Sequence, residues 1–244
     1  MRGVWLLRIA ALGALAGCGT DLAFVPPEQV LEISACPEGA SCEKVADGRS
    51  RITVEACVPE SVHTPRADAQ LTLTLSAGQW EGQAASARTV SASIKTDPCF
   101  RPTLVTPSAL TTIRVDAELK GVRQFIEIPL QPATLTALDL VPSPLQPKAG
   151  QETQLQVQVS AANDGLPTLG TRVSFEVVGV EPAAAQVSLW PDQTEVDAQG
   201  KALGRMLPST GVTKVTLRLR AIPPGPASPV PTLERTFTLN VAPP

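Results

Sequence analysis

Apolar and polar residues alternate along most of the chain after its first twenty residues. Leu71, Leu73 and Leu75 are separated by threonines, and the same spacing recurs over 155–159 and 237–241 with other polar residues in between. A period of two places the apolar side chains on one face of a half-buried antiparallel strand. No stretch keeps helical spacing for three turns, and the 24 prolines would interrupt most helices. The pattern therefore predicts an all-β fold.

The two halves of the chain carry these strand-like segments in the same order. The matching pairs are 71–75 with 173–177, 115–119 with 215–219, and 126–130 with 237–241. Each half then holds about seven short strands in about 105 residues, which is typical of an immunoglobulin-like sandwich. We expect two tandem immunoglobulin-like β-sandwich domains, at 28–132 and 134–244, and call them the first and second module.

Turn sequences in the second module resemble a known family. They are Ala162-Asn163-Asp164-Gly165 and the stretch 196–202, with Val173-x-Phe175 between them. These motifs resemble the bacterial Ig-like modules of the invasin and intimin type, which implies the same sandwich fold. Asn-Asp-Gly and Asp-x-x-Gly favour positive φ angles at turns. The first module has Cys99-Phe100 where the second turn has its glycine, so it is a divergent relative.

The N-terminus has the features of an export signal. Arg2 and Arg8 accompany a short apolar run, as in secretory signal peptides, and the run is shorter than the roughly 18 residues that span a membrane. Leu15-Ala16-Gly17-Cys18 then resembles the lipobox of bacterial lipoproteins. The resemblance implies that 1–17 are removed, that Cys18 carries acyl chains such as palmitate, and that 18–27 form the lipidated tether.

The residue after the lipobox cysteine bears on localisation. Gly19 stands where lipoproteins retained in the inner membrane carry aspartate. The family resemblance therefore implies an outer-membrane lipoprotein more than an inner-membrane one. It leaves open whether the modules face the periplasm or the cell surface.

Four further cysteines all lie in the first module: Cys36, Cys42, Cys57 and Cys99. An even number in an exported protein indicates two disulfides. In one pairing, Cys36 closes a small loop with Cys42, and Cys57 pairs with Cys99. A Cys42–Cys99 bond is the rival, because the expected strand order places Cys57 and Cys99 near opposite ends, whereas bridged Cα atoms lie within about 7 Å. Metal ligation is disfavoured, since the chain has no C-x-x-C pair and one histidine.

Composition argues against nucleic-acid binding and catalysis. The net charge is −3 at pH 7, becomes about −5 without the signal peptide, and includes no basic run. The single histidine, His63, lies in a proline-containing loop. The chain has no G-x-S-x-G motif, no phosphate-binding glycine loop and no dinucleotide-binding motif. We expect a non-enzymatic protein without cofactor, bound metal, nucleic-acid partner or small-molecule substrate.

Sugar and calcium sites are also disfavoured. Tyrosine is absent, and only Trp80 and Trp190 remain beyond the signal peptide. We expect both rings to cap the edge of the core rather than to stack on sugars. Asp192, Glu195 and Asp197 are the nearest approach to a calcium cluster, but turn formation explains them better.

A proline-rich insertion distinguishes the second module. The first module is expected to turn tightly at Lys120-Gly121, whereas the second inserts 222–232 at the equivalent position. The prolines of this loop are Pro223, Pro224, Pro226, Pro229 and Pro231. They make the loop stiff, so it would lose little entropy on docking. The sequence leaves two interpretations of this loop open: a rigid insertion that the fold tolerates, or a binding loop.

These features favour a lipid-anchored envelope protein whose modules act as a short stalk or an adhesion and interaction surface. Its partners would be the membrane, through the lipid, and an envelope protein. The alternative is an accessory or docking subunit of an outer-membrane or periplasmic complex.

The lipid anchor gives the first testable prediction. The mature protein should partition into detergent and begin at an acylated Cys18, and Cys18→Ala should leave the precursor uncut or release the protein from the membrane. Mass spectrometry of the N-terminal peptide checks this. An unmodified N-terminus at another residue would show that the lipobox assignment is wrong.

Overall fold

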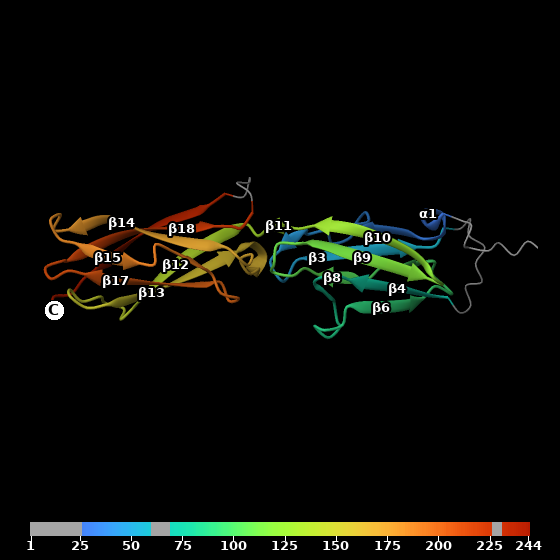
Figure 1. Cartoon of the computed structure of the whole chain (residues 1–244), viewed down its shortest axis with the longest axis horizontal. Helices are drawn as coiled ribbons and strands as arrows, with labels where there is room; N and C mark the ends of the chain where they lie inside the picture. The colour runs from blue at the N-terminus through green and yellow to red at the C-terminus, as the bar shows by residue number, and fades with distance from the viewer. Residues whose placement is uncertain (1–25, 60–68, 226–230) are drawn as a thin grey trace, which may run out of the picture.

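The computed structural model describes residues 26–59, 69–225 and 231–244. Within these ranges the chain is almost entirely β and forms tandem sandwiches that lie end to end, with the C-terminus at the outer end of the second (Figure 1). No helix of the described part is long and apolar enough to cross a membrane. Of the residues selected from the sequence, Cys18, His63, Pro226 and Pro229 lie outside the described residues.

The first module begins with the short helix α1 (Pro27–Val30). Its strands are β1 (Glu32–Ala35), β2 (Val45–Ala46), β3 (Arg51–Cys57), β4 (Gln70–Leu75), β5 (Gln79–Trp80), β6 (Thr89–Ser93), β7 (Cys99–Phe100), β8 (Thr103–Val105), β9 (Thr112–Leu119), β10 (Val122–Pro129) and β11 (Gln131–Pro132). One sheet has the order β1-β3-β8-β5, with β7 also paired to β3, and the facing sheet has the order β10-β9-β4-β6.

The second module follows the same plan. Its strands are β12 (Leu135–Ser143), β13 (Thr153–Ala161), β14 (Arg172–Glu181), β15 (Val187–Trp190), β16 (Gln193–Glu195), β17 (Lys201–Pro208), β18 (Lys214–Ile222) and β19 (Leu233–Asn240), with the 3₁₀ turn η3 (Ala162–Asp164) after β13. Its sheets have the orders β12-β13-β17-β15 and β16-β14-β18-β19.

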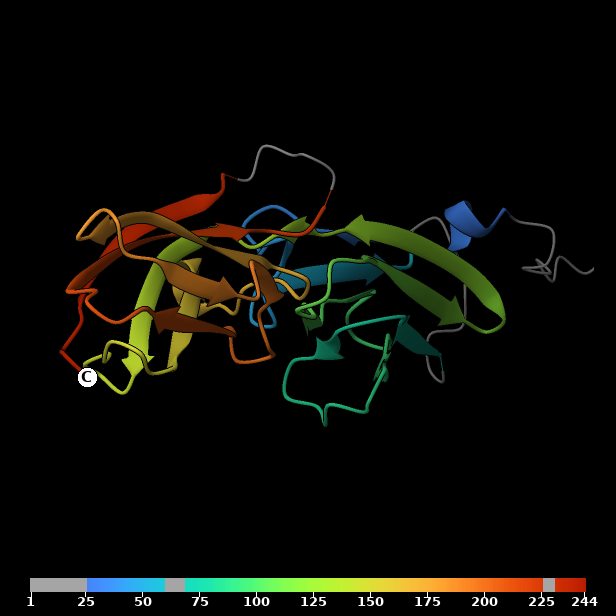
Figure 2. The same cartoon turned by 60° about the vertical axis from the view of Figure 1, so that its left-hand side comes forward.

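The topology repeats strand for strand, as the order of the sequence segments predicts. β1, β3, β8 and β5 take the places of β12, β13, β17 and β15, and β10, β9, β4 and β6 take those of β19, β18, β14 and β16. The β9–β10 hairpin extends from the end of the first module that lies away from the second (Figure 2). The tandem Ig-like β-sandwich fold is therefore confirmed.

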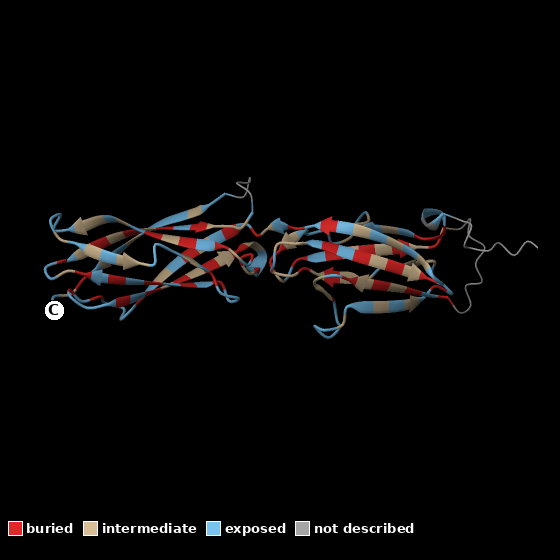
Figure 3. Ribbon diagram, in the orientation of Figure 1, coloured by how far each residue is buried: buried red, intermediate tan, exposed pale blue. Residues whose placement is uncertain are grey.

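The alternating pattern places the apolar residues inside each sandwich. In β4, Leu71, Leu73 and Leu75 are buried while the threonines between them are partly exposed, and Figure 3 shows the same alternation along the longer strands. One core gathers residues from Val30 to Leu130 and the other from Leu135 to Val241. Burial of these apolar faces against each other is the main force that holds each pair of sheets together.

The tryptophans differ from each other in burial. Trp80 is fully buried, and its indole N–H donates to the Arg88 carbonyl at 2.9 Å. It is a core residue, because β5 turns the ring inward and supplies a partner for its one polar atom. Trp190 ends β15 and is half-buried, which fits the expected position at the edge of the core.

Turn geometry agrees with the sequence in one place and differs in another. Lys120 and Gly121 have φ angles of 48° and 84° and join β9 to β10 in the expected two-residue turn. Asn163 and Asp164 also have positive φ, at 56° and 55°. Gly165 does not, with φ at −67°. The glycine of this motif therefore has another role, which the module junction explains.

The disulfides join Cys36 to Cys42 and Cys57 to Cys99, with Cα–Cα distances of 5.0 and 4.1 Å. The rival Cys42–Cys99 pairing is wrong. β7 runs antiparallel to the end of β3 and places Cys99 directly opposite Cys57, rather than at the other end of the sandwich.

Removing each disulfide should destabilise the first module by different amounts. Loop-closure entropy predicts a loss of about 4 kcal/mol for the Cys57→Ser, Cys99→Ser pair and about 2 kcal/mol for the Cys36→Ser, Cys42→Ser pair, because the bridges span 42 and 6 residues. Chemical denaturation of the full chain, followed with probes in each module, measures both losses. The second module contains no cysteine, so an equal shift of its transition would contradict this assignment.

Candidate functional site at the module junction

The chain passes from one module to the next through a segment that is itself hydrogen-bonded. β11 pairs in parallel with β2, and the Gln131 N–H donates to the Lys44 carbonyl at 2.8 Å. β12 begins at Leu135, so only Ala133 and Thr134 separate the two pairings. The connection leaves little slack for the modules to reorient independently.

A buried threonine of the second module fastens this connection. Thr168 is fully buried, and its hydroxyl donates to the Ala46 carbonyl at 2.7 Å while accepting the Ala133 N–H at 2.8 Å. One side chain thus joins β2, the connecting segment and the loop after η3. The Thr171 hydroxyl and N–H both donate to the Thr168 carbonyl, at 2.6 and 3.0 Å, which fixes the loop that carries it.

Asp47 organises the facing loop of the first module. Its side chain is almost completely buried, with 4% exposed. The carboxylate accepts the N–H groups of Arg49 and Ser50 at 2.8 and 2.6 Å, and the hydroxyls of Ser50 and Thr106 at 2.8 and 3.3 Å. A buried carboxylate is stable only with such donors, so this set holds the loop in one shape.

The loop shaped by Asp47 is the surface on which the second module rests. The Leu166 N–H donates to the Asp47 carbonyl at 3.1 Å, and the Leu169 N–H donates to the Ser108 carbonyl at 2.9 Å. Gly165 lies against the same aspartate: a Cβ on Gly165 would lie 2.7 Å from the Asp47 Oδ2 atom. Gly165 therefore permits close approach between the modules, which corrects its predicted role as a positive-φ residue.

Sequence reasoning missed Asp47 and Thr168 and misjudged Gly165. The one available signal is the composition of the connection. Between β10 and β12 the chain reads Leu-Gln-Pro-Ala-Thr, without the glycine and serine that make a linker flexible.

A polar groove of about 560 Å³ runs beside the junction. It is lined by Ser41, Cys42, Glu43, Asp47, Gly48, Arg49, Ser50, Arg51, Val105 and Asn163. Arg51 forms an ion pair with Glu81 at 2.9 Å, and the oxygens of the Asp47 carboxylate already accept hydrogen bonds from its own loop. This lining contains no aromatic ring or histidine and gives no indication of a ligand class.

The described ends of the proline-rich loop also lie at the junction. Pro224 packs near Gly170, and Gly225 lies beside Leu110 and Pro132 of the first module. Pro223 and Pro224 line a smaller groove of about 360 Å³ beside Arg172 and Glu195, and Pro231 is exposed. The loop thus emerges at the contact between modules rather than at the free end of the second module.

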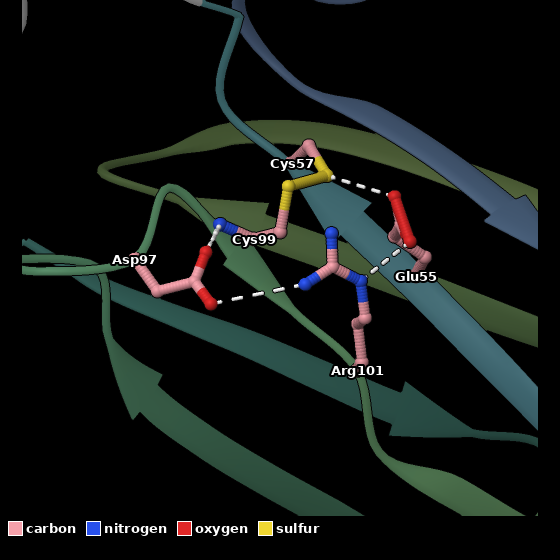
Figure 4. Close-up of a disulfide and its surroundings, with 5 residues drawn as sticks. All are labelled: Glu55, Cys57, Asp97, Cys99 and Arg101. Atoms are coloured by element: carbon pink, nitrogen blue, oxygen red, sulfur yellow. Dashed lines mark hydrogen bonds and ion pairs between the residues drawn. A yellow bond between two sulfur atoms is a disulfide. The ribbon is translucent and has the colours of Figure 1, made fainter.

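The surroundings of the Cys57–Cys99 disulfide do not form a metal site. Glu55 and the two sulfurs lie within 4.8 Å of one another, but both sulfurs are used in the S–S bond (Figure 4). Arg101 donates to Glu55 at 2.6 Å and lies 3.8 Å from Asp97. The hydrogen bond to Glu55 raises the pKa of Arg101. Arg101, Glu55 and Asp97 thus form a small network of ion pairs beside the disulfide.

Two of the acidic residues considered for calcium, Glu195 and Asp197, have local side-chain partners. The Asp197 carboxylate accepts the N–H groups of Gln199 and Lys201 at 2.8 and 2.9 Å, so it shapes the turn before β17 as expected. Glu195 lies 3.5 Å from Arg172. The Asp197 contacts support the turn interpretation, whereas Glu195 ends the strand β16 and lies opposite Arg172 in the sheet.

The outer face of β14, β18 and β19 carries a ladder of ion pairs. Arg218 donates to both carboxylate oxygens of Glu176, at 2.9 and 2.8 Å, and Arg220 pairs with Glu234 at 2.8 Å. The hydrogen bonds from Arg218 lower the pKa of Glu176, so its contribution to stability is present at neutral pH and is lost as the pH falls through that lowered value. These charges satisfy one another, and exposed pairs of this kind contribute little to stability.

Thr168 gives a direct test of the junction. Thr168→Val keeps the shape of the side chain but leaves the Ala133 N–H and the Ala46 carbonyl without their partner. We expect a loss of about 2 kcal/mol in the free energy of unfolding and a broader distribution of module orientations in small-angle scattering. Thr236→Val, at an exposed position of β19, is the matched control and should change stability by less than about 0.5 kcal/mol. Equal behaviour of the two variants would contradict the role of Thr168.

Comparisons with known proteins agree with this architecture. No protein-family model and no curated protein matches the chain. Among solved structures, invasin, a bacterial integrin-binding protein, aligns with 87% of the chain at 20% identity and a TM-score of 0.57, over 39% of its own length. The Yersinia pseudotuberculosis adhesin InvE aligns with 86% of the chain at 17% identity and a TM-score of 0.51, over 59% of its own length. The chain therefore spans less than two thirds of the length of each protein, and the likeness establishes the fold: tandem Ig-like sandwiches of the kind found in invasin.

Proposed function

We propose that this chain is a non-enzymatic, lipid-anchored envelope protein whose two modules form a short, stiff stalk that presents an interaction surface. The observation that carries the proposal is the module junction. Buried hydrogen bonds of Thr168 and the close contact of Gly165 with Asp47 hold the modules in one arrangement. A protein that needed independent domains would be expected to join them by a flexible linker.

In this proposal the tether sets how far the first module lies from the membrane, and the modules set how far the chain extends beyond it. The tether from Gly19 to Pro26, ahead of helix α1, reaches at most about 28 Å when fully extended, so the first module stays close to the membrane. Eight-residue strands such as β9 are about 27 Å long. The second module then adds a further sandwich length along the same direction and carries the C-terminus at its outer end (Figure 1).

Relatives in fold support an adhesion-type role. InvE is described as an adhesin and invasin as an integrin-binding protein, and both contain sandwiches of this kind. We propose a corresponding interaction role for this chain, with a protein as the partner and with an outer-membrane location through Cys18. No cofactor or small-molecule substrate enters this proposal.

A stalk and a docking subunit differ in their partners. Gentle crosslinking of intact cells followed by purification in detergent should recover the wild-type protein without a stoichiometric envelope partner. Cys18→Ala is the matched control for the anchor, and it should be recovered as the uncut precursor or from the soluble fraction, with its modules folded. A partner that copurifies in constant ratio with wild type would overturn the stalk proposal in favour of a docking subunit.

A further inference from the structure

β6 is an open edge of the first module. It pairs only with β4, at the end of the sheet β10-β9-β4-β6, and Figure 1 shows it along the lower rim of the module. Most other edge strands of the described chain are short or covered. β5, β15 and β16 have two to four residues, while β1 contacts β10 and β12 contacts β19 where the facing sheets meet.

The hydrogen bonds to β4 show which backbone groups of β6 remain free. The Leu75 N–H donates to the Arg88 carbonyl at 2.9 Å, and the Ile94 N–H donates to the Ala69 carbonyl at 3.3 Å. Hydrogen-bonded pairs alternate with non-bonded pairs along an antiparallel ladder. Thr89, Ser91 and Ser93 therefore direct their N–H and C=O groups away from β4, toward the open side.

The sequence of β6 lacks the usual protection of an exposed edge. Natural edge strands carry lysine, proline, bulges or inward charges that prevent pairing with another strand. β6 reads Thr-Val-Ser-Ala-Ser and pairs with β4 in an unbroken register. Its outer-face hydroxyls are held in place, since the Ser91 and Thr89 oxygens lie 2.9 and 3.2 Å from those of Thr72 and Thr74. The edge is regular and free of charge.

Two exposed cations flank this uncharged edge. Arg88 precedes β6 and Lys95 lies two residues after it, and neither forms an ion pair with another described residue. Among the described residues, every arginine other than Arg49 and Arg88 forms an ion pair with an aspartate or a glutamate. The paired ones are Arg51, Arg101, Arg114, Arg123, Arg172, Arg205, Arg218, Arg220 and Arg235.

The flanking charges distinguish between two occupants of the edge. In a symmetric antiparallel pair of two copies centred on Ser91, Arg88 of one copy would lie opposite Ile94 of the other, and Lys95 opposite Ala87. Neither cation of either copy would then face an opposite charge, so a second copy would gain nothing from Arg88 and Lys95. A strand from another protein with an acidic residue at each end would instead place opposite charges at both positions.

We propose that the β6 edge binds an extended, acidic-ended segment of a partner protein by strand addition to the sheet β10-β9-β4-β6. Backbone hydrogen bonds to Thr89, Ser91 and Ser93 supply the attachment, and Arg88 and Lys95 select acidic residues seven positions apart. Strand addition to an exposed sheet edge is a common mode of peptide recognition. The site belongs to the first module and is independent of the junction.

The test uses the full chain and a defined probe. The probe is a labelled eight-residue peptide of alternating threonine and valine with glutamate at both ends, and its binding is followed by fluorescence anisotropy. Ser91→Pro removes an N–H that faces away from β4, so it should leave the module folded and weaken binding by about tenfold or more. Ser91→Ala keeps the backbone donor and should bind within about twofold of wild type.

The charge component has its own control. A peptide with lysine at both ends should bind wild type about tenfold more weakly, and the Arg88→Glu, Lys95→Glu double variant should reverse that preference. Thermal unfolding of each variant confirms that the first module remains folded. Equal binding by Ser91→Pro and Ser91→Ala would overturn the proposal. A second result would also overturn it: the wild-type protein dimerises with rising concentration, Ser91→Pro abolishes the dimer, and neither protein binds the peptide. The occupant of the edge would then be a second copy.

Discussion

The arrangement of the whole molecule depends on one constraint at the junction: polar groups buried between two modules must find partners there. The Thr168 hydroxyl supplies both a donor and an acceptor, so it satisfies the Ala46 carbonyl and the Ala133 N–H at once. Asp47 meets the same requirement within the first module by collecting donors from its own loop. Because an unpaired buried group costs more than a single hydrogen bond gains, these contacts favour one orientation over all others.

The fold follows closely from the sequence because strand periodicity records a physical division between core and solvent. Leu71, Leu73 and Leu75 are buried as their spacing predicts, and the repeated order of segments reappears as a repeated strand order. The pairing of cysteines was harder to predict. It depends on β7, a strand of only two residues whose place beside β3 no pattern in the sequence indicates. Short pairings of this kind depend on tertiary packing and leave no periodic signal.

The junction shows where sequence reasoning reaches its limit. Asn163, Asp164 and Gly165 form a recognisable turn motif, and the first two have the positive φ angles that such a motif predicts. Gly165 serves a different purpose, since its missing side chain makes room for Asp47, more than a hundred residues away in the chain. Turn chemistry is local and can be inferred from neighbouring residues. Close approach between modules is a property of two surfaces together, so it becomes visible only when both are in place.

The module junction and the β6 edge lie at different places along the chain, and this division bears on the proposed role. In the proposed anchored protein, the hydrogen-bonded junction would limit bending between the modules, so freedom of movement would be left to the proposed tether before the first module. The β6 edge is on the first module, which follows the proposed anchor, whereas the second module carries a face of mutually paired charges. With the proposed lipid on Cys18, a strand bound at β6 would be held near the membrane by backbone hydrogen bonds that do not depend on the second module. The second module would then act at a distance set by the length of one sandwich, and the junction would determine the direction in which it points.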